Sequence, residues 1–126
     1  KVQSYTVVPS AIFTSPEIGD VGLTEEQARE QGIAARSAVF QFRELGKAQA
    51  MGALSGLFKI VAEEGTGKLL GAHIAGAHAS DLIAEAALAE ATFALQKGCS
   101  ARDLFETIHA HPTLSEGLYE AAGMLA

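Results

Sequence analysis

The sequence predicts an α+β fold in which helices pack against an antiparallel β-sheet. Apolar segments with strand-like character are grouped in the middle of the chain, on both sides of a glycine-containing turn at residues 63–67. Segments with helical periodicity lie before and after them, and the longest covers residues 80–97. Because 126 residues with 48% hydrophobic side chains are enough for one core, we expect a single domain over residues 1–126.

The first expected helix follows an extended opening segment. Prolines and glycine interrupt residues 1–20, which predicts an extended lead-in and then a short strand at residues 20–23. Thr24 and Gln27 have the spacing of a capping box, and two acidic residues follow Thr24 directly. We therefore expect a short helix that ends at Gly32.

The central strands come next. Residues 36–42 alternate in part between apolar and polar side chains, as in a strand with one face in water. Residues 57–62 and 68–75 are apolar segments that flank the turn at residues 63–67. They predict a β-hairpin, because glycine adopts at little cost the positive φ angles that a tight turn needs.

The second half of the chain is predicted to be mainly helical. Residues 80–97 carry two adjacent apolar stripes, Gly98 ends this helix, and Ser100 begins another short one. The alanine-rich face of residues 84–94 suits packing on the sheet or self-association about a two-fold axis. The stripes are Leu82, Ala86, Ala89 and Phe93, and Ile83, Ala87, Ala91 and Leu95. The aromatic residues expected in the core are Phe13, Phe40, Phe42, Phe58, Phe93 and Phe105.

Charge and composition disfavour several classes of function. Fifteen acidic and nine basic residues give a net charge of −6, which disfavours binding to nucleic acid or to an anionic membrane surface. No apolar run reaches the roughly 20 residues of a membrane-spanning helix. The single cysteine, Cys99, excludes an internal disulfide and favours a reducing, cytoplasmic location. The chain begins with Lys1 and not with methionine, so we expect a fragment of a longer protein.

The candidate site lies in residues 107–117, where titratable side chains are most concentrated. His111 can take up and return a proton near neutral pH, and a carboxylate can orient it and stabilise its cation. Glu116 is near enough in the sequence to bond to His111 from the start of a final helix at residues 113–122. Pro112 restricts the backbone of His111 and raises the chance of a cis bond, which would hold the imidazole in one orientation.

The same residues also have a structural interpretation. Thr113 and Glu116 have the spacing of a second capping box, which would explain both residues without any catalysis. His111 would then be a loop residue, and Pro112 would only start the helix. The residue pattern by itself leaves both interpretations open.

A family resemblance favours the chemical interpretation. Residues 109–116, HAHPTLSE, resemble the C-terminal motif of the flavin-dependent pyridine nucleotide-disulfide oxidoreductases, most closely that of the dihydrolipoamide dehydrogenases. Residues 12–18 and 21–25 resemble the opening of the interface domain in that family. Residues 56–61 and 70–74 resemble its central hairpin, so the matching segments occur in the family's order along nearly the whole chain.

The resemblance implies the C-terminal dimerisation domain, with the interface-domain fold, of a homodimeric oxidoreductase. His111 would be the general base that deprotonates a dihydrolipoyl thiol in the partner subunit's active site, and Glu116 would hold the far imidazole nitrogen. The substrate would be a lipoyl-bearing protein or a small disulfide or dithiol. Electrons would pass through a cysteine pair and FAD to NAD.

The resemblance also implies that much of the machinery lies outside this chain. FAD and NAD would belong to domains of the parent chain, because this sequence has no dinucleotide-binding fingerprint and Cys99 has no cysteine partner. Backbone near His111 and Pro112 would contact the FAD of the partner subunit. The isolated domain is expected to be inactive and to bind no cofactor alone.

The exact subfamily stays open. Gln49 stands where family members often have arginine, and His78 occupies an unusual place for a histidine. A glutathione-reductase-like or other disulfide reductase and a non-catalytic dimerisation module are the alternatives. The chain ends without vicinal cysteines, which disfavours mercury reduction.

We expect no metal site. The His-x-His motif at residues 109–111, combined with Glu116 and His73 or His78, is a weak zinc signal because no third ligand has a recognisable spacing. Cys99 is expected to be a structural thiol, since no activating base is evident nearby.

Overall fold

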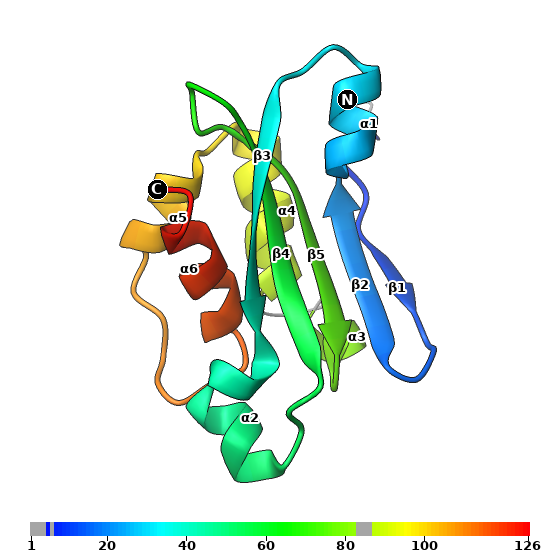
Figure 1. Ribbon diagram of the computed structural model, residues 1–126, viewed down its shortest axis with the longest axis vertical. Coiled ribbons are helices and arrows are strands. Elements are labelled where there is room, and N and C mark those ends of the chain that lie inside the picture. Colours follow the sequence, from blue (N-terminus) through cyan, green and yellow to red (C-terminus); the bar gives the residue numbers. More distant parts are fainter. Residues whose placement is uncertain (1–4, 6, 83–86) are drawn as a thin grey trace.

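The computed structural model describes residues 5, 7–82 and 87–126, and its centre is a five-stranded antiparallel sheet (Figure 1). The strands are β1 (Ser10–Ile12), β2 (Glu17–Gly22), β3 (Ala35–Gln41), β4 (Gly56–Glu63) and β5 (Leu69–Gly76). Their order across the sheet is β1-β2-β5-β4-β3, and every neighbouring pair is antiparallel. The predicted hairpin is the β4–β5 pair at the centre of the sheet, so this prediction is confirmed.

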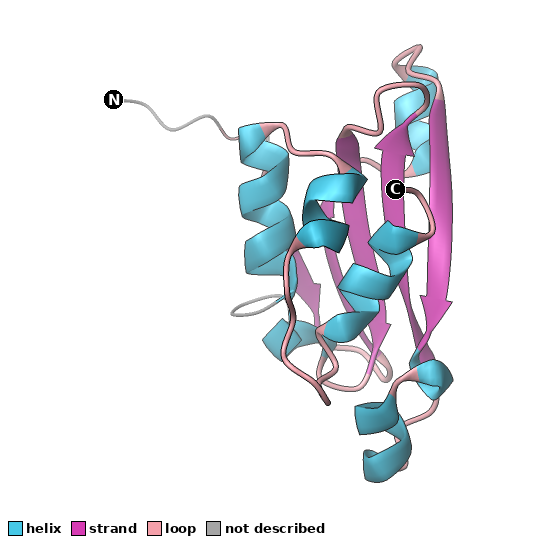
Figure 2. Ribbon diagram, turned by 90° about the vertical axis from the view of Figure 1, so that its left-hand side faces the viewer, coloured by secondary structure: helices cyan, strands magenta, loops and turns pink. Residues whose placement is uncertain are grey.

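Six helices surround the sheet within the described part of the chain. They are α1 (Glu25–Glu30), α2 (Gly46–Met51), α3 (Ala79–Asp81), α4 (Ala87–Lys97), α5 (Ala101–Glu106) and α6 (Glu116–Gly123), with a 3₁₀ turn at Phe42–Glu44. Helices α4, α5 and α6 lie on one side of the sheet, and α1 lies on the other (Figure 2). The α+β class is therefore confirmed. Among the residues described, no helix combines the length and the apolar character that crossing a membrane requires.

The core lies between the sheet and the three helices on its covered face. Phe58 is paired with Ile74, and Ile60 with Ala72, across the central strands. All four side chains are almost completely buried, as is Leu118 of α6. Because successive side chains of a strand point to opposite faces, these residues form one apolar layer under the helices. Helix α6, which follows the candidate site, is thus fixed to the centre of the sheet.

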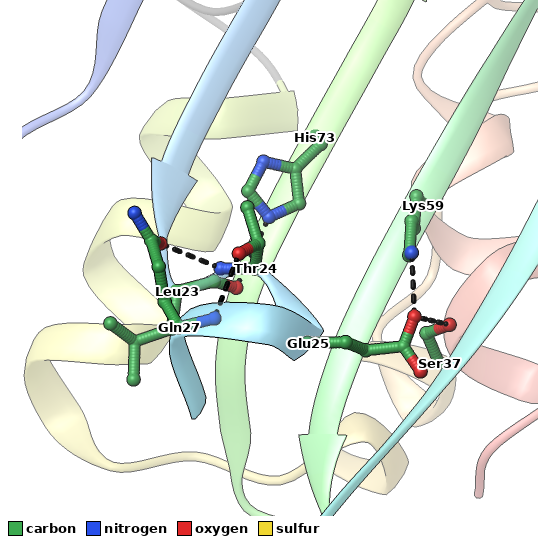
Figure 3. A network of polar contacts seen from close by, with 7 residues as sticks. All are labelled: Leu23, Thr24, Glu25, Gln27, Ser37, Lys59 and His73. Atoms are coloured by element: carbon green, nitrogen blue, oxygen red, sulfur yellow. Dashed lines mark hydrogen bonds and ion pairs between the residues drawn. The ribbon is translucent and has the colours of Figure 1, made fainter. Parts of the chain in front are cut away.

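The opposite face carries polar contacts that attach α1 (Figure 3). Lys59 Nζ and Ser37 Oγ both donate to Glu25 Oε2, at 2.6 and 2.7 Å. The bond from Lys59 first, and that from Ser37 second, lower the pKa of Glu25. His73 of β5 lies beside the end of β2, with its Nε2 3.2 Å from the carbonyl oxygen of Leu23. These contacts explain Lys59 and His73 as parts of the fold.

The first capping box is present as predicted. Gln27 donates its backbone N–H to Thr24 Oγ1 at 3.1 Å, and Thr24 donates its own to Gln27 Oε1 at 2.9 Å. The expected stop at Gly32 is matched by its positive φ of 74° just beyond α1. Ser100 caps α5 in the same reciprocal way, through Asp103.

The opening segment differs from the prediction. Strand β1 was expected only as an extended lead-in, and β2 begins at Glu17 instead of residue 20. The longer β2 pairs with β5 from Glu17 to Gly22, opposite Gly76 to Gly71. Pairing with residues 49 to 59 positions further along the chain supplies the hydrogen bonds, and no local pattern reveals it. Helix α2 was likewise not predicted.

One of the two apolar stripes predicted for the alanine-rich helix does not face the sheet along its whole length. Ala91 and Ala94 of α4 are buried, but Phe93 is 60% exposed, which contradicts its place in the core. Phe13 and Phe105 are also exposed, so their core assignment was wrong. Small alanine side chains let α4 approach the sheet closely and turn Phe93 outward. The expected continuous helix over residues 80–97 includes residues 83–86, which lie outside the described part.

Candidate functional site

The candidate site lies on the loop between α5 and α6, and the start of α6 holds it in place. Leu114 and Leu118 are buried on either side of this start. Gly117 lies directly on the ring of Phe58, because a Cβ atom added to Gly117 would be 2.2 Å from the ring carbons. Close packing of this kind leaves Glu116, the first residue of α6, in a fixed position relative to the sheet.

The central contact joins the two residues predicted as a pair. His111 Nδ1 lies 2.8 Å from Glu116 Oε1. A carboxylate only accepts, so Nδ1–H donates, and in the neutral ring Nε2 then carries the free lone pair. The His111 side chain is 76% exposed and that of Glu116 is 18% exposed. The arrangement therefore presents a proton acceptor outward and shields the carboxylate behind it.

The second oxygen of Glu116 binds the loop backbone. Thr113 donates its backbone N–H to Glu116 Oε2 at 2.7 Å, whereas its hydroxyl donates to the carbonyl of Ala110 at 2.8 Å. Helix α6 begins at Glu116 and not at Thr113. The predicted second capping box is therefore wrong, because the Thr113 hydroxyl serves the turn before the helix. Glu116 instead connects the imidazole of His111 to the backbone next to cis-Pro112.

Glu116 is ionised in this setting. Burial raises its pKa, but the hydrogen bonds from Thr113 and His111, together with the electrostatic influence of the His111 and His109 rings, outweigh burial and hold the pKa below its usual range. The carboxylate is thus negative at neutral pH and can stabilise a protonated His111. A base with an outward lone pair and a fixed anion behind it can take a proton and return it.

His109, to which the sequence assigned no role, lies in the same loop but faces the protein. Its Nδ1 is 2.8 Å from the carbonyl oxygen of Thr107, and its Nε2 is 2.9 Å from Glu90 Oε2 on α4. The side chain is only 10% exposed. Its ring lies 5.5 Å from that of Tyr119, which stacks on Phe105. The sequence gives no local signal for this pair, because 19 residues separate its members.

Within the described residues, neither the two remaining histidines nor the cysteine forms a hydrogen bond with the His111–Glu116 pair. His78 contacts Asp81 at 3.3 Å beside α3, and His73 lies on the opposite face of the sheet. Cys99 is partly buried before α5, where its backbone bonds to Ala94 and Leu69. Across residues 5, 7–82 and 87–126, no group of three or more His, Cys, Asp or Glu side chains is arranged to hold a metal ion.

Sequence comparison identifies the relatives of this chain. Residues 8–122 match the family described as pyridine nucleotide-disulphide oxidoreductase, dimerisation domain. The dihydrolipoyl dehydrogenase of Thermus scotoductus is 48% identical over 118 residues, which are 94% of this chain and 24% of that protein. The leghemoglobin reductase of Glycine max is 44% identical over 94% of this chain and 22% of its own length.

Solved structures agree with the family match. LpdA from Mycobacterium tuberculosis superposes with a TM-score of 0.83 and 28% identity, over 94% of this chain and 25% of its own. The HOCl-induced flavoprotein disulfide reductase RclA from Escherichia coli gives a TM-score of 0.84 and 25% identity, over 96% and 27%. The chain spans about a quarter of the length of each relative. It therefore belongs to the pyridine nucleotide-disulphide oxidoreductase family and corresponds to the dimerisation domain of that family.

Proposed function

We propose that this chain is the dimerisation domain of a homodimeric, FAD-dependent and NAD-linked dihydrolipoamide dehydrogenase, and that His111 and Glu116 supply its acid–base pair to the partner subunit. One observation carries the proposal. The 2.8 Å contact between His111 Nδ1 and Glu116 Oε1 leaves Nε2 free on an exposed side chain. The 48% identity to a dihydrolipoyl dehydrogenase supports the choice of substrate.

The pair addresses the first chemical barrier of dithiol oxidation. A thiol with a pKa of about 8.5 is mostly protonated at neutral pH, whereas only the thiolate attacks a disulfide efficiently. Nε2 of His111 takes the thiol proton, and the resulting thiolate attacks the disulfide of the parent enzyme. Glu116 holds the ring in the required tautomer and stabilises the imidazolium that forms. The same ring can later return the proton.

The reacting sulfur atoms must come from outside this chain. Its only cysteine is Cys99, which is partly buried and cannot form an internal disulfide. His111 is highly exposed, so its free nitrogen is accessible to a second chain. These two facts support delivery of the base to the partner subunit's cysteine pair and not to sulfur in this domain.

The exposed backbone of His111 and Pro112 fits a contact to the partner's flavin. Pro112 has no N–H, and the carbonyl of His111 accepts no hydrogen bond from residues 5, 7–82 or 87–126. These carbonyls would offer acceptors to the flavin edge. FAD bound by the parent chain would supply the electron-accepting chemistry between the reduced cysteine pair and NAD. We place the parent enzyme in the cytoplasm, because the single cysteine of this domain is typical of a protein in a reducing compartment.

The test compares the two half-reactions of the parent enzyme. With His111→Ala, flavin reduction by dihydrolipoamide should slow by about 100-fold or more, the usual range for a lost general base. Flavin reduction by NADH should keep its rate, because no thiol is deprotonated in that step. His78→Asn is a matched control, since asparagine tolerates the positive φ of His78. An unchanged dithiol rate in His111→Ala would leave this domain as a non-catalytic dimerisation module.

A second candidate substrate class is a different disulfide, favoured by the fold similarity to a flavoprotein disulfide reductase. The His111–Glu116 pair would then return its proton to a leaving thiolate during disulfide reduction. Steady-state assays of the parent enzyme with lipoamide and with glutathione disulfide separate the two classes. Faster turnover with glutathione disulfide would replace the lipoamide assignment and keep the acid–base pair.

A further inference from the structure

The His109 ring is fully engaged by the protein. The carbonyl of Thr107 can only accept, so Nδ1 must carry a hydrogen. One proton then lies between Nε2 and Glu90 Oε2, whichever of the two atoms holds it. With both nitrogens occupied and the side chain only 10% exposed, His109 has no free atom for a substrate. Any role of His109 in the reaction must therefore act through the residues that it contacts.

Those neighbours connect His109 to the base. The contact with Glu90 joins the loop to α4, a helix that packs on β2 and β5. His109 is separated from His111 by one residue, Ala110, whose carbonyl is bonded to the Thr113 hydroxyl. In contrast, the preceding side chain, Ile108, is almost fully exposed. The inward side chain of His109 is thus the anchor nearest to His111 on its N-terminal side.

We propose that His109, held by Glu90, is a positioning residue that sets the place of the His111–Glu116 pair for proton removal from the thiol. This inference rests on the proposed function of that pair. Glu116 and Thr113 fix the loop from the side of α6, and His109 and Glu90 fix it from the side of α4. Two anchors on different elements leave the imidazole of His111 little freedom to move away from its carboxylate.

The charged and titratable groups around His109 come from three helices. Glu90 lies on α4, Glu106 on α5, and Glu116 and Tyr119 on α6. The last three line one cavity together with His109. Removal of Glu90 therefore leaves other carboxylates near His109. We expect it to displace the loop more than to change the electrostatics around the His109 ring.

The experiment uses four variants of the parent enzyme. Glu90→Ala removes the partner and suits a helix, and His109→Asn keeps a donor near Thr107 but is too short to reach Glu90. Each should lower the limiting rate of flavin reduction by dihydrolipoamide about tenfold, since a base misplaced by about 1 Å can lose up to about 100-fold. Glu90→Gln should restore most of the rate, because its amide can still bond to Nε2. The double variant His109→Asn with Glu90→Ala should be no slower than either single variant.

The readouts separate positioning from general damage and from failure of the proposed function. Flavin reduction by NADH, the dimer mass and the half-saturating dithiol concentration should stay unchanged in all four variants. The inference would be overturned by equal losses in both half-reactions, by unchanged dithiol rates in Glu90→Ala and His109→Asn, or by additive losses in the double variant. If His111→Ala itself leaves the dithiol rate unchanged, the proposed function fails. If His111→Ala is slow but Glu90→Ala is not, only the positioning role fails.

Discussion

His109 and His111 lie in one loop and meet glutamates at almost the same distance, 2.9 and 2.8 Å, but they face opposite ways. His109 is 10% exposed and bonded at both nitrogens, whereas His111 is 76% exposed and bonded at one. A glutamate partner alone therefore does not identify a base. The free second nitrogen and its access to solvent distinguish the proposed base from the proposed anchor.

The two glutamates differ as well. Glu116 divides its oxygens between the His111 ring and the Thr113 backbone, so one carboxylate sets both the side chain and the loop beneath it. Glu90 lies on α4 and holds His109 from outside the loop. Variants of the His111–Glu116 pair should therefore change proton transfer itself, whereas variants of the His109–Glu90 pair should change only the position of the base.

Among the variants that keep His111, the largest effect is expected from Glu116→Gln in the parent enzyme. A hydrogen bond to a charged group contributes about 1.5 to 3 kcal/mol, so dithiol-dependent flavin reduction should slow by roughly tenfold or more. The midpoint of the rate–pH profile should move to lower pH, because glutamine does not stabilise the imidazolium. Glu120→Gln, on an exposed residue one turn further along α6, is the control and should leave both unchanged. An unshifted profile in Glu116→Gln would show that the Glu116 carboxylate does not stabilise the imidazolium of His111.

Gly117→Ala tests whether the packing of Gly117 on Phe58 fixes the start of α6, which carries Glu116. The added Cβ would lie 2.2 Å from the buried ring of Phe58, so the free energy of unfolding should fall by about 1 to 3 kcal/mol despite the better helix propensity of alanine. Gly46→Ala is the matched control, because a Cβ there meets no atom within 4 Å. Chemical denaturation of the parent enzyme measures both. Equal stability of the two variants would show that Phe58 does not fix the start of α6.

The smallest effect is a titration shift. His111→Ala should raise the pKa of Glu116 toward its usual value, because one hydrogen bond and the electrostatic influence of the imidazole are lost. Since the folded pKa is lowered, the pair contributes stability above the usual glutamate value and loses it as pH falls through the lowered value. Carboxyl carbon-13 NMR of the labelled chain measures the shift. Glu25, whose pKa is lowered by Lys59 and Ser37 on the other face, is the internal control; an equal change at both residues would contradict the account.

Local patterns predicted much of the fold. The Thr24–Gln27 box and the central hairpin depend on partners a few residues apart, so their sequence signals were sufficient. The Thr113–Glu116 spacing was the same but gave only half of a box, because Thr113 donates its backbone N–H to Glu116 whereas its hydroxyl donates to the carbonyl of Ala110. Spacing alone does not show which of several nearby partners a polar group takes.

Contacts between segments that are far apart in the sequence could not be predicted from it. The early start of β2 at Glu17 depends on its pairing with β5, and the outward turn of Phe93 depends on the close approach of Ala91 and Ala94 to the sheet. At the site, the His111–Glu116 contact was predicted from five residues of separation, whereas Glu90 was missed as the partner of His109. Tertiary packing decides such contacts, and a local pattern does not encode it.

Mixed dimers of the parent enzyme test most directly that His111 serves the opposite subunit. One subunit would carry His111→Ala, and the other would have its cysteine pair replaced by serine. If the base acts across the interface, the mixed dimer contains one complete site and should regain about half of the wild-type dihydrolipoamide oxidation per dimer, whereas either parental dimer should be nearly inactive. A mixed dimer as inactive as its parents would contradict the account.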